Sequence, residues 1–240
     1  MILIACGLQR EANILRGVGV IAIPGGGDAV KLEAMLEAKA VGATMIVSSG
    51  IAGALDPTLV TGDVVIDLKP LPFRGGVGVG SVSLTETNEH GDSPHPNPSP
   101  KGEGLKAALP HAYHGLIIGQ DHIAVSVAEK AALAATGALA VDMESHIAAR
   151  VAARHGLPFI AIRTISDTAQ ETLPPAALVG MNPDGSMALG KVLWSLARNP
   201  GQLPALIRTG QSAERAFKSL ARVHATLGPA WATLLAQGSV

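Results

Sequence analysis

The chain has 240 residues, a formal net charge of −1 and a mean hydropathy of +0.34. Apolar residues make up 48% and charged residues 15%, which indicates one sizeable globular domain or two small ones and excludes a disordered chain. The small net charge gives no general attraction to nucleic acid, and no apolar run reaches the roughly 18–20 residues of a transmembrane segment. The single cysteine, Cys6, excludes an internal disulfide framework and suits a reducing cytosol.

Strand-like aliphatic runs recur along the first two thirds of the chain. Helix-like segments alternate with them, notably residues 28–41, where Asp28 suits an N-cap, and residues 144–155, which end at Gly156. Continuous aliphatic strands are typical of sheets covered on both faces. The pattern predicts an α/β fold, a single-domain three-layer sandwich with a central mixed, largely parallel sheet flanked by helices. The strand-like runs are ILIAC, VGVIAIP, TMIVSSG, GDVVIDL, HGLIIG, ALAVDM and PFIAIRTIS.

Three glycine-rich turns follow predicted strands, at residues 6–15, 24–30 and 48–65. Glycine after a strand lets the backbone approach a ligand and point N–H groups into a site, although glycines also simply end strands. None of the turns matches the phosphate-binding loop of nucleotide triphosphatases or the full dinucleotide fingerprint. Both of those enzyme classes are therefore disfavoured.

Residues 87–104, TNEHGDSPHPNPSPKGEG, interrupt the pattern with four prolines, three glycines and almost no apolar side chains. This composition predicts a flexible surface insertion rather than packed structure. Part of it, PHPNPSPKGEG, resembles translated copies of a dispersed bacterial repeat element, which favours a neutral insertion. A lid over the site is the functional alternative.

Acidic side chains follow three of the predicted strands: Glu11, Glu144 and Asp167, with Asp142 close to the second. The carboxyl ends of parallel strands meet at one edge of a sheet, where ligands of such folds bind. Each acid also has a structural alternative, because helix dipoles favour acids in the first turn and aspartate is common in turns. Three such acids together predict a shared site at this edge.

The segment 187–240 is predicted to form C-terminal helices, interrupted at NPGQLP and LGP. It carries six basic residues and one acidic residue, whereas the rest of the chain has an excess of acidic residues. The basic residues either lie on solvated faces of peripheral helices or form a surface that approaches anionic lipid heads.

Four segments, SSGIAGAL, GDVVI, VDMES and PFIAIRTISD, have an order and spacing that resemble the nucleoside phosphorylase and nucleosidase superfamily. The resemblance covers nearly all of residues 1–170. Within the superfamily, the segments resemble purine nucleoside phosphorylases and, more closely, methylthioadenosine/S-adenosylhomocysteine nucleosidases. The later segment MNPDGSMALGKVLWSLARNPGQLPALIR is similar to one branch, the hopanoid-associated phosphorylases. The resemblance implies an enzyme that cleaves the N-glycosidic bond of an adenine nucleoside and forms a homo-oligomer.

The resemblance assigns the catalytic carboxyl groups to Asp167 and Glu11. Adenine is a poor leaving group until its N7 is protonated, and a semi-buried carboxylic acid can supply that proton. Asp167 would do so, positioned by Ser166 and Arg163. Glu11 aligns with the glutamate that activates water in the nucleosidases.

The resemblance also implies a set of residues that bind the nucleoside. Glu144 would accept hydrogen bonds from the ribose 2′- and 3′-hydroxyls, since the two oxygens of a carboxylate suit a vicinal diol. Met143 would pack on the sugar face, with a plain core methionine as the alternative. The backbone around Ala52 and Gly53 would line the base and the sugar.

Histidine marks a departure from the family pattern. In GQDHIAVS, His122 takes the position at which the nucleosidases carry an aromatic residue that stacks on the purine, with Ile123 beside it. His122 would stack on or hydrogen-bond adenine, and a surface histidine is the alternative. The histidines near the insertion have no convincing zinc-ligand spacing, so we expect no metal and no cofactor.

The nucleophile and the exact substrate are left open by the sequence. Glu11 favours water slightly because a carboxylate repels a phosphate dianion, whereas Arg10 and the PGGGD turn suit inorganic phosphate, the co-substrate of a phosphorylase. If the hopanoid branch applies, the substrate is adenosylhopane, a lipid-linked nucleoside, and the C-terminal helices would contact a membrane. Alternatives are a soluble purine or methylthioadenosine nucleosidase and a non-catalytic nucleoside-binding protein of this fold. We expect a cytoplasmic protein.

Overall fold

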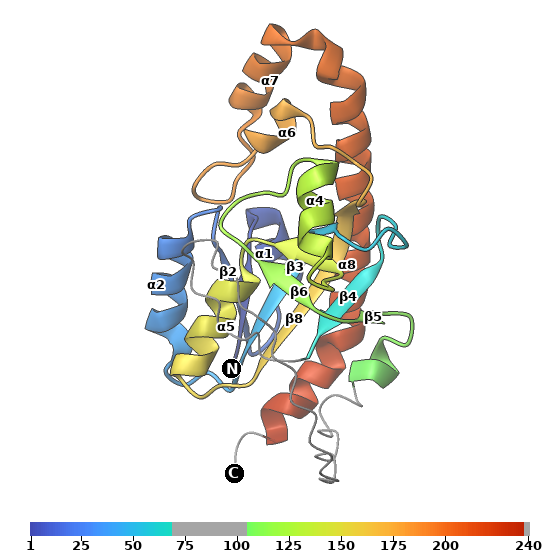
Figure 1. Ribbon diagram of the computed structural model, residues 1–240. Coiled ribbons are helices and arrows are strands. Elements are labelled where there is room, and N and C mark those ends of the chain that lie inside the picture. Colours follow the sequence, from blue (N-terminus) through green and yellow to red (C-terminus); the bar gives the residue numbers. More distant parts are fainter. Residues whose placement is uncertain (69–104, 238–240) are drawn as a thin grey trace, which may run out of the picture.

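The computed structural model describes residues 1–68 and 105–237 (Figure 1). The predicted insertion at residues 87–104 lies outside the described residues.

An eight-stranded sheet forms the centre of the described part of the chain, with strands β1 (Ile2–Cys6), β2 (Val20–Pro24), β3 (Met45–Ala54), β4 (Val64–Asp67), β5 (Tyr113–His114), β6 (Ile117–Gly119), β7 (Ala140–Asp142) and β8 (Phe159–Asp167). The hydrogen-bonded order is β2-β1-β3-β8-β4-β5, and β7 pairs with the end of β3 and with β6. Among these described strands, the pairs β3–β7 and β4–β8 are antiparallel and the others are parallel. The expected mixed, largely parallel sheet is confirmed.

The helices of the described residues include α1 (Gln9–Leu15), α2 (Ala29–Ala40), α4 (Val127–Ala134), α5 (Ser145–Arg154), α6 (Pro175–Leu178), α7 (Leu189–Arg198) and α8 (Leu203–Gln237), with a 3-10 turn at Pro200–Gln202. Helices α2 and α5 lie against one face, and α1 and α8 lie against the other (Figure 1). This arrangement confirms the predicted three-layer sandwich. Among the described residues, no helix combines the length and apolar character needed to cross a membrane.

Each face of the sheet buries its own aliphatic core. Leu36 of α2 and Val151 of α5 pack together on one face, whereas Leu220 of α8 packs with Ile4 and Cys6 on the other. Fully burying one such aliphatic side chain contributes about 1.5–3 kcal/mol, which compensates for the scarcity of aromatic residues. Burial raises the pKa of the Cys6 thiol, so Cys6 is an inert residue of the core.

The segment 181–187, between α6 and α7, folds back onto the turns that follow β1 and β2. The backbone N–H of Gln9 donates to the carbonyl oxygen of Gly185 at 2.9 Å. Gly26 has a φ of +66°, and a methyl group there would lie 2.2 Å from the carbonyl oxygen of Pro183. Glycine therefore lets the two segments lie in direct contact, beneath the α6–α7 pair that extends past the end of the sheet (Figure 1).

Candidate active site

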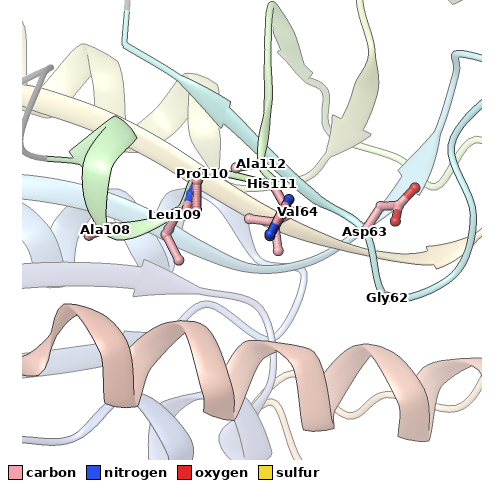
Figure 2. Close-up of a pocket in the computed structure, with 8 residues that line it drawn as sticks. All are labelled: Gly62, Asp63, Val64, Ala108, Leu109, Pro110, His111 and Ala112. Atoms are coloured by element: carbon pink, nitrogen blue, oxygen red, sulfur yellow. The ribbon is translucent and has the colours of Figure 1, made fainter.

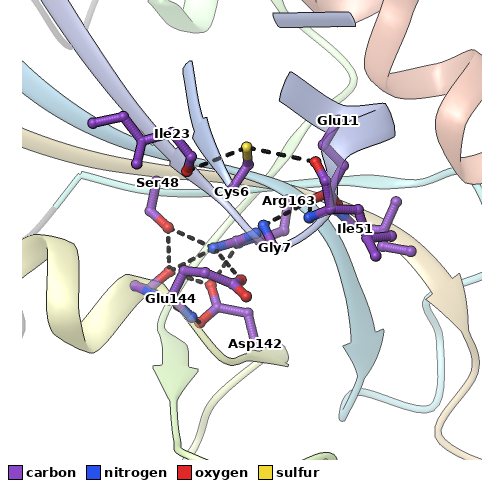
Figure 3. Close-up of polar contacts among 11 residues, drawn as sticks. Cys6, Gly7, Glu11, Ile23, Ser48, Ile51, Asp142, Glu144 and Arg163 are labelled. Atoms are coloured by element: carbon purple, nitrogen blue, oxygen red, sulfur yellow. Dashed lines mark hydrogen bonds and ion pairs between the residues drawn. The ribbon is translucent and has the colours of Figure 1, made fainter. Parts of the chain in front are cut away.

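A cluster of buried polar side chains lies where several strands of the sheet end (Figure 3). Glu11 is on α1 just after β1, Ser48 is on β3, Asp142 ends β7, and Arg163 is on β8. Because β1, β3 and β8 are parallel neighbours, residues from distant parts of the sequence meet at one edge of the sheet.

The guanidinium group of Arg163 is the centre of the cluster and is fully buried. Its Nε lies 2.5 Å from Oδ2 of Asp142, and its Nη2 lies 2.5 Å from Oγ of Ser48 and 3.3 Å from Oε2 of Glu144. Burial alone would lower the pKa of this group, but the charges of Asp142, Glu144 and Glu11 outweigh it and raise the pKa. Arg163 therefore stays charged and draws the carboxyl groups together.

Asp142 supports this cluster through structural contacts. Its Oδ1 accepts hydrogen bonds from the backbone N–H groups of Glu144 at 3.2 Å and Ser145 at 2.9 Å, and the hydroxyl of Ser145 donates to Oδ2. These bonds satisfy N–H groups at the start of α5 that have no partner within the helix. Asp142 thereby fixes both the beginning of α5 and the guanidinium group of Arg163.

Three backbone N–H groups bind the carboxyl group of Glu11. Its Oε2 accepts from Gly7 at 2.8 Å and Leu8 at 2.7 Å, and its Oε1 accepts from Ile51 at 2.7 Å. Burial raises the pKa of Glu11 despite these bonds. Each carboxylate oxygen can accept two hydrogen bonds, so Oε1 keeps one acceptor position.

Gly7 and Gly50 have no side chains that would keep the charged groups of Glu11, Glu144 and Arg163 apart. A methyl group at Gly7 would lie 2.7 Å from Oε1 of Glu144 and 3.6 Å from Oε2 of Glu11. A methyl group at Gly50 would lie 2.6 Å from Oε1 of Glu11 and 2.8 Å from Nη1 of Arg163. Among the described residues, this Nη1 has no hydrogen-bond partner. A spare acceptor and a spare donor therefore flank Gly50.

Glu144, the residue expected to bind the ribose hydroxyls, has a raised pKa. Burial raises its pKa to about 8, and the charges of Asp142 and Glu11 add to the effect, whereas Arg163 opposes it. A carboxyl group that holds its proton near neutral pH can donate as well as accept a hydrogen bond. Both abilities suit contact with hydroxyl groups.

Asp167 lies at the end of β8, beside Gly53 of β3, where a methyl group would stand 3.1 Å from Oδ2. Its Oδ1 lies 2.7 Å from Oγ of Ser166, and its Oδ2 lies 2.6 Å from Nζ of Lys130. Lys130 carries no signal in the sequence, because a lysine within VAEKAALA looks like an ordinary solvent-facing helix residue. The partner of this lysine follows 37 residues later.

The remaining predicted residues lie around this edge and make fewer polar contacts than the carboxyl cluster. Ala52 is buried, and its carbonyl oxygen lies 3.1 Å from Oγ of Ser166, while the half-buried Met143 reaches the glycine turn after β2. His122 is exposed and Ile123 is half-buried, in the loop before α4. The carbonyl oxygen of His122 accepts a hydrogen bond from Gln120 at 2.8 Å. Its contact with a base stays a prediction.

Two cavities lie apart from the carboxyl cluster. One, of about 290 Å³, lies between the start of β4 and residues 108–112, with Asp63 and His111 in its wall (Figure 2). The other, of about 380 Å³, is lined by residues of α7 and its neighbours. Neither contains a predicted site residue. Within residues 1–68 and 105–237, no three His, Cys, Asp or Glu side chains form a group able to hold a metal ion.

The fold and the site define an α/β protein whose buried carboxyl groups converge at the carboxyl edge of a mixed sheet. The chain belongs to the phosphorylase superfamily, whose family model matches residues 15–197. The superfamily expected from the sequence is confirmed, and with it an enzyme of the nucleosidase or nucleoside phosphorylase class.

Solved structures of nucleosidases have a similar fold. S-adenosylhomocysteine nucleosidase from Streptococcus pyogenes, in complex with 5-methylthiotubericidin, is 20% identical with a TM-score of 0.59, over 95% of this chain and 96% of that one. The 5′-methylthioadenosine/S-adenosylhomocysteine nucleosidase of S. pneumoniae is 18% identical with a TM-score of 0.57, over 95% and 98% of the two chains. Futalosine hydrolase of Helicobacter pylori is 18% identical with a TM-score of 0.53, over 93% and 96%. No curated protein matches the chain.

Proposed function

We propose that this protein cleaves the N-glycosidic bond of an adenine nucleoside and releases adenine. One observation carries the proposal. On strand β3, Gly50 lies beside the side chains of Glu11 and Arg163. Gly53, three residues later on the same strand, lies beside the side chain of Asp167. Three residues of a strand span about 10 Å, a separation that suits a sugar at one end and the far edge of a base at the other.

In the proposed reaction, Asp167 acts on the base of the nucleoside and Glu144 acts on its ribose. Asp167 gives a proton to N7 of the base while the electron pair of the C1′–N9 bond moves to the base. Glu144 binds the ribose hydroxyls, and a nucleophile adds to the electron-poor C1′. These roles follow the resemblance, and the convergence of Glu11 and Glu144 around Gly7 supports them.

Water is the proposed nucleophile, because both candidates for binding phosphate are already engaged. Arg10 forms an ion pair with Glu214 at 2.7 Å and lies 4.1 Å above the ring of Phe217 on α8. The PGGGD turn is covered by the segment 181–187. Glu11 keeps an acceptor position beside the spare donor of Arg163, which suits a small polar molecule such as water. Phosphorolysis, with inorganic phosphate as co-substrate, is the alternative.

The finer proposal is that the nucleoside is adenosylhopane, in hopanoid biosynthesis. Exposed apolar side chains around α7 support it, with exposed fractions of 69% for Met187, 64% for Leu193 and 61% for Trp194. Lys191 and Arg198 on the same helix suit anionic lipid heads, and the segment 181–187 links this helix to the site. We propose peripheral membrane contact through these helices. A soluble purine or methylthioadenosine nucleosidase and a non-catalytic nucleoside-binding protein are the alternatives. Homo-oligomers are proposed from the resemblance, and a cytoplasmic location from the single cysteine, which suits a reducing compartment.

Adenine release from adenosine, 5′-methylthioadenosine and adenosylhopane, measured with and without phosphate, tests the proposal. We expect release without phosphate, and a loss of at least about 100-fold in Asp167→Asn, the usual contribution of a general acid. Full activity in Asp167→Asn would show that the acid is wrongly assigned. Release that requires phosphate would replace hydrolysis by phosphorolysis, and binding without turnover would favour the binding protein.

A further inference from the structure

Lys130, on α4, is a lysine with no exposed surface. Its Nζ donates hydrogen bonds to Oδ2 of Asp167 at 2.6 Å, to the carbonyl oxygen of Thr168 at 2.7 Å and to that of Glu171 at 2.9 Å. An ammonium group has three donors, so this set of acceptors uses all of them. Buried charge is costly unless it is paired, and a residue that only filled space would be better apolar. The pair therefore points to a role at Asp167.

The other carboxyl oxygen of Asp167, Oδ1, contacts the hydroxyl group of Ser166, which can form a hydrogen bond with either the ionised or the protonated form of Asp167. Oγ of Ser166 lies 2.7 Å from Oδ1 of Asp167 and 3.1 Å from the carbonyl oxygen of Ala52. A hydroxyl has a single proton, so it donates to one of these acceptors at a time. When Asp167 is ionised, Ser166 donates to Oδ1. When Asp167 carries a proton on Oδ1, that proton can be donated to Ser166, which then donates to Ala52. Both states are satisfied without movement of the heavy atoms.

We propose that Lys130 is a positioning residue of the reaction: it holds Asp167 through Oδ2 and balances the charge that Asp167 acquires on giving its proton to the base. This inference rests on the proposed N-glycosidic cleavage. In that step one proton passes from Asp167 to N7, the electron pair of the C1′–N9 bond goes to the base, and Lys130 keeps its three protons.

The physical reason lies in the charge that develops during the step. A neutral acid becomes a carboxylate at the edge of a sheet that already gathers Asp142, Glu144 and Glu11. A fixed ammonium 2.6 Å from Oδ2 stabilises that carboxylate without any reorganisation of solvent. The contacts of the ammonium with the carbonyl groups of Thr168 and Glu171 keep it in place throughout.

The test compares two substrates that differ in their need for a proton. Cleavage of adenosine needs protonation of the base, whereas 4-nitrophenyl β-D-riboside has a leaving group that departs as a stable anion. In Lys130→Met we expect kcat/KM for adenosine to fall about 100-fold, the effect of removing one preorganised electrostatic group, and that for the nitrophenyl riboside to fall less than about threefold. Lys39→Met, at an exposed position of α2, is the matched control and should change neither value.

A double-mutant cycle covers the case in which Lys130→Met folds poorly. The variants Asp167→Asn and Asp167→Asn/Lys130→Met should cleave adenosine equally slowly, because a residue that acts through Asp167 has no further effect once that acid is gone. A further large loss in the double variant, or equal losses on both substrates in Lys130→Met, would overturn the inference while the wild type still releases adenine. A wild type that cleaves no nucleoside would overturn the proposed function and this inference together.

Discussion

At the scale of single residues, the site depends on one guanidinium group among more carboxyl groups than it can neutralise. Asp142 forms the shortest ion pair with Arg163, and Glu144 and Glu11 lie close enough to raise its pKa. The pKa values of Glu144 and Glu11 are themselves raised, with burial as the largest cause. The cluster therefore favours keeping a proton within it, which suits a site that binds hydroxyl groups and moves protons.

Replacing Arg163 tests how far the cluster depends on it. Arg163→Met leaves Asp142 and Glu144 buried without their counter-charge, and breaking a buried pair in this way costs about 3–5 kcal/mol. We expect the free energy of unfolding, measured by urea titration, to fall by that amount.

Arg154→Met is the control for Arg163→Met. Arg154 pairs with Glu33 and Glu37 on the surface, where solvent screens the interaction, so its loss should matter far less. Equal losses in the two variants would contradict the central role of Arg163.

The raised pKa of Glu144 predicts a particular dependence of stability on pH. A carboxyl group with a higher pKa in the folded state stabilises the fold fully below its unfolded value of 4.5, and this contribution is lost as the pH rises through about 8. The wild type should therefore lose stability between pH 5 and pH 9. Glu144→Gln removes this titration, so its Tm, measured by calorimetry across the same range, should fall less steeply.

A matched control for Glu144→Gln is Glu33→Gln. The Arg150 guanidinium holds the pKa of Glu33 below 4.5, so the stabilising contribution of Glu33 is lost only as the pH falls below that range. Its profile from pH 5 to pH 9 should run parallel to that of the wild type. Parallel profiles for Glu144→Gln and the wild type would refute the prediction.

At the scale of elements, the segment 181–187 joins the α6–α7 pair to the wall of the site. The bond between Gln9 and Gly185 and the contact of Gly26 with Pro183 fix this segment on the turns after β1 and β2. The position of the segment is therefore coupled to the turn from which Glu11 reaches the cluster.

Gly26→Ala should displace the segment 181–187. The substitution combines a left-handed backbone, which costs a side chain about 1–2 kcal/mol, with a clash against Pro183. We expect a lower Tm together with a lower kcat/KM for adenine release. Gly42→Ala is the control, since Gly42 has a φ of +87° and nothing within 4 Å of an added methyl group. A drop in kcat/KM of the same size in both variants would exclude a specific effect of the segment.

The exposed apolar face of α7 predicts binding to lipid vesicles. Leu193→Ser/Trp194→Ser should reduce co-sedimentation with vesicles containing phosphatidylglycerol several-fold, and 0.5 M salt should weaken binding further by screening Lys191 and Arg198. Val18→Ser, at an exposed apolar position outside α7, should leave binding unchanged. Wild-type protein that remains entirely in the supernatant would refute membrane contact.

At the scale of the whole molecule, the sequence predicts the fold and much of the edge where the site lies, but not the long-range pairings. The VDMES and PFIAIRTISD segments form one helix–strand unit, and the structure places Glu144 and Asp167 at its two ends, as the spacing predicts. The run HGLIIG, predicted as one strand, is divided at Gly115 into β5 and β6, because the two parts pair with different strands. Periodicity within a segment cannot show which neighbour each part of it will find.

The same limit explains why the sequence does not reveal the partners of Lys130 and Arg10. Lys130 turns inward toward three acceptors at the end of β8 and in the turn after it, and Arg10 forms an ion pair with Glu214, about two hundred positions later in the sequence. Local patterns say nothing of such partners. They become visible only when helices from distant parts of the chain are packed on the sheet.

The burial of Lys130 gives the protein an internal chemical reporter. All three protons of its Nζ are engaged, so an acylating reagent reaches this amine only when α4 separates from the turn after β8. In a time course with acetic anhydride followed by mass spectrometry, Lys39 should react at once and Lys130 should react last. The labelling rate of one amine would then measure how often the native protein opens at the end of β8, where Asp167 lies, without any engineered probe.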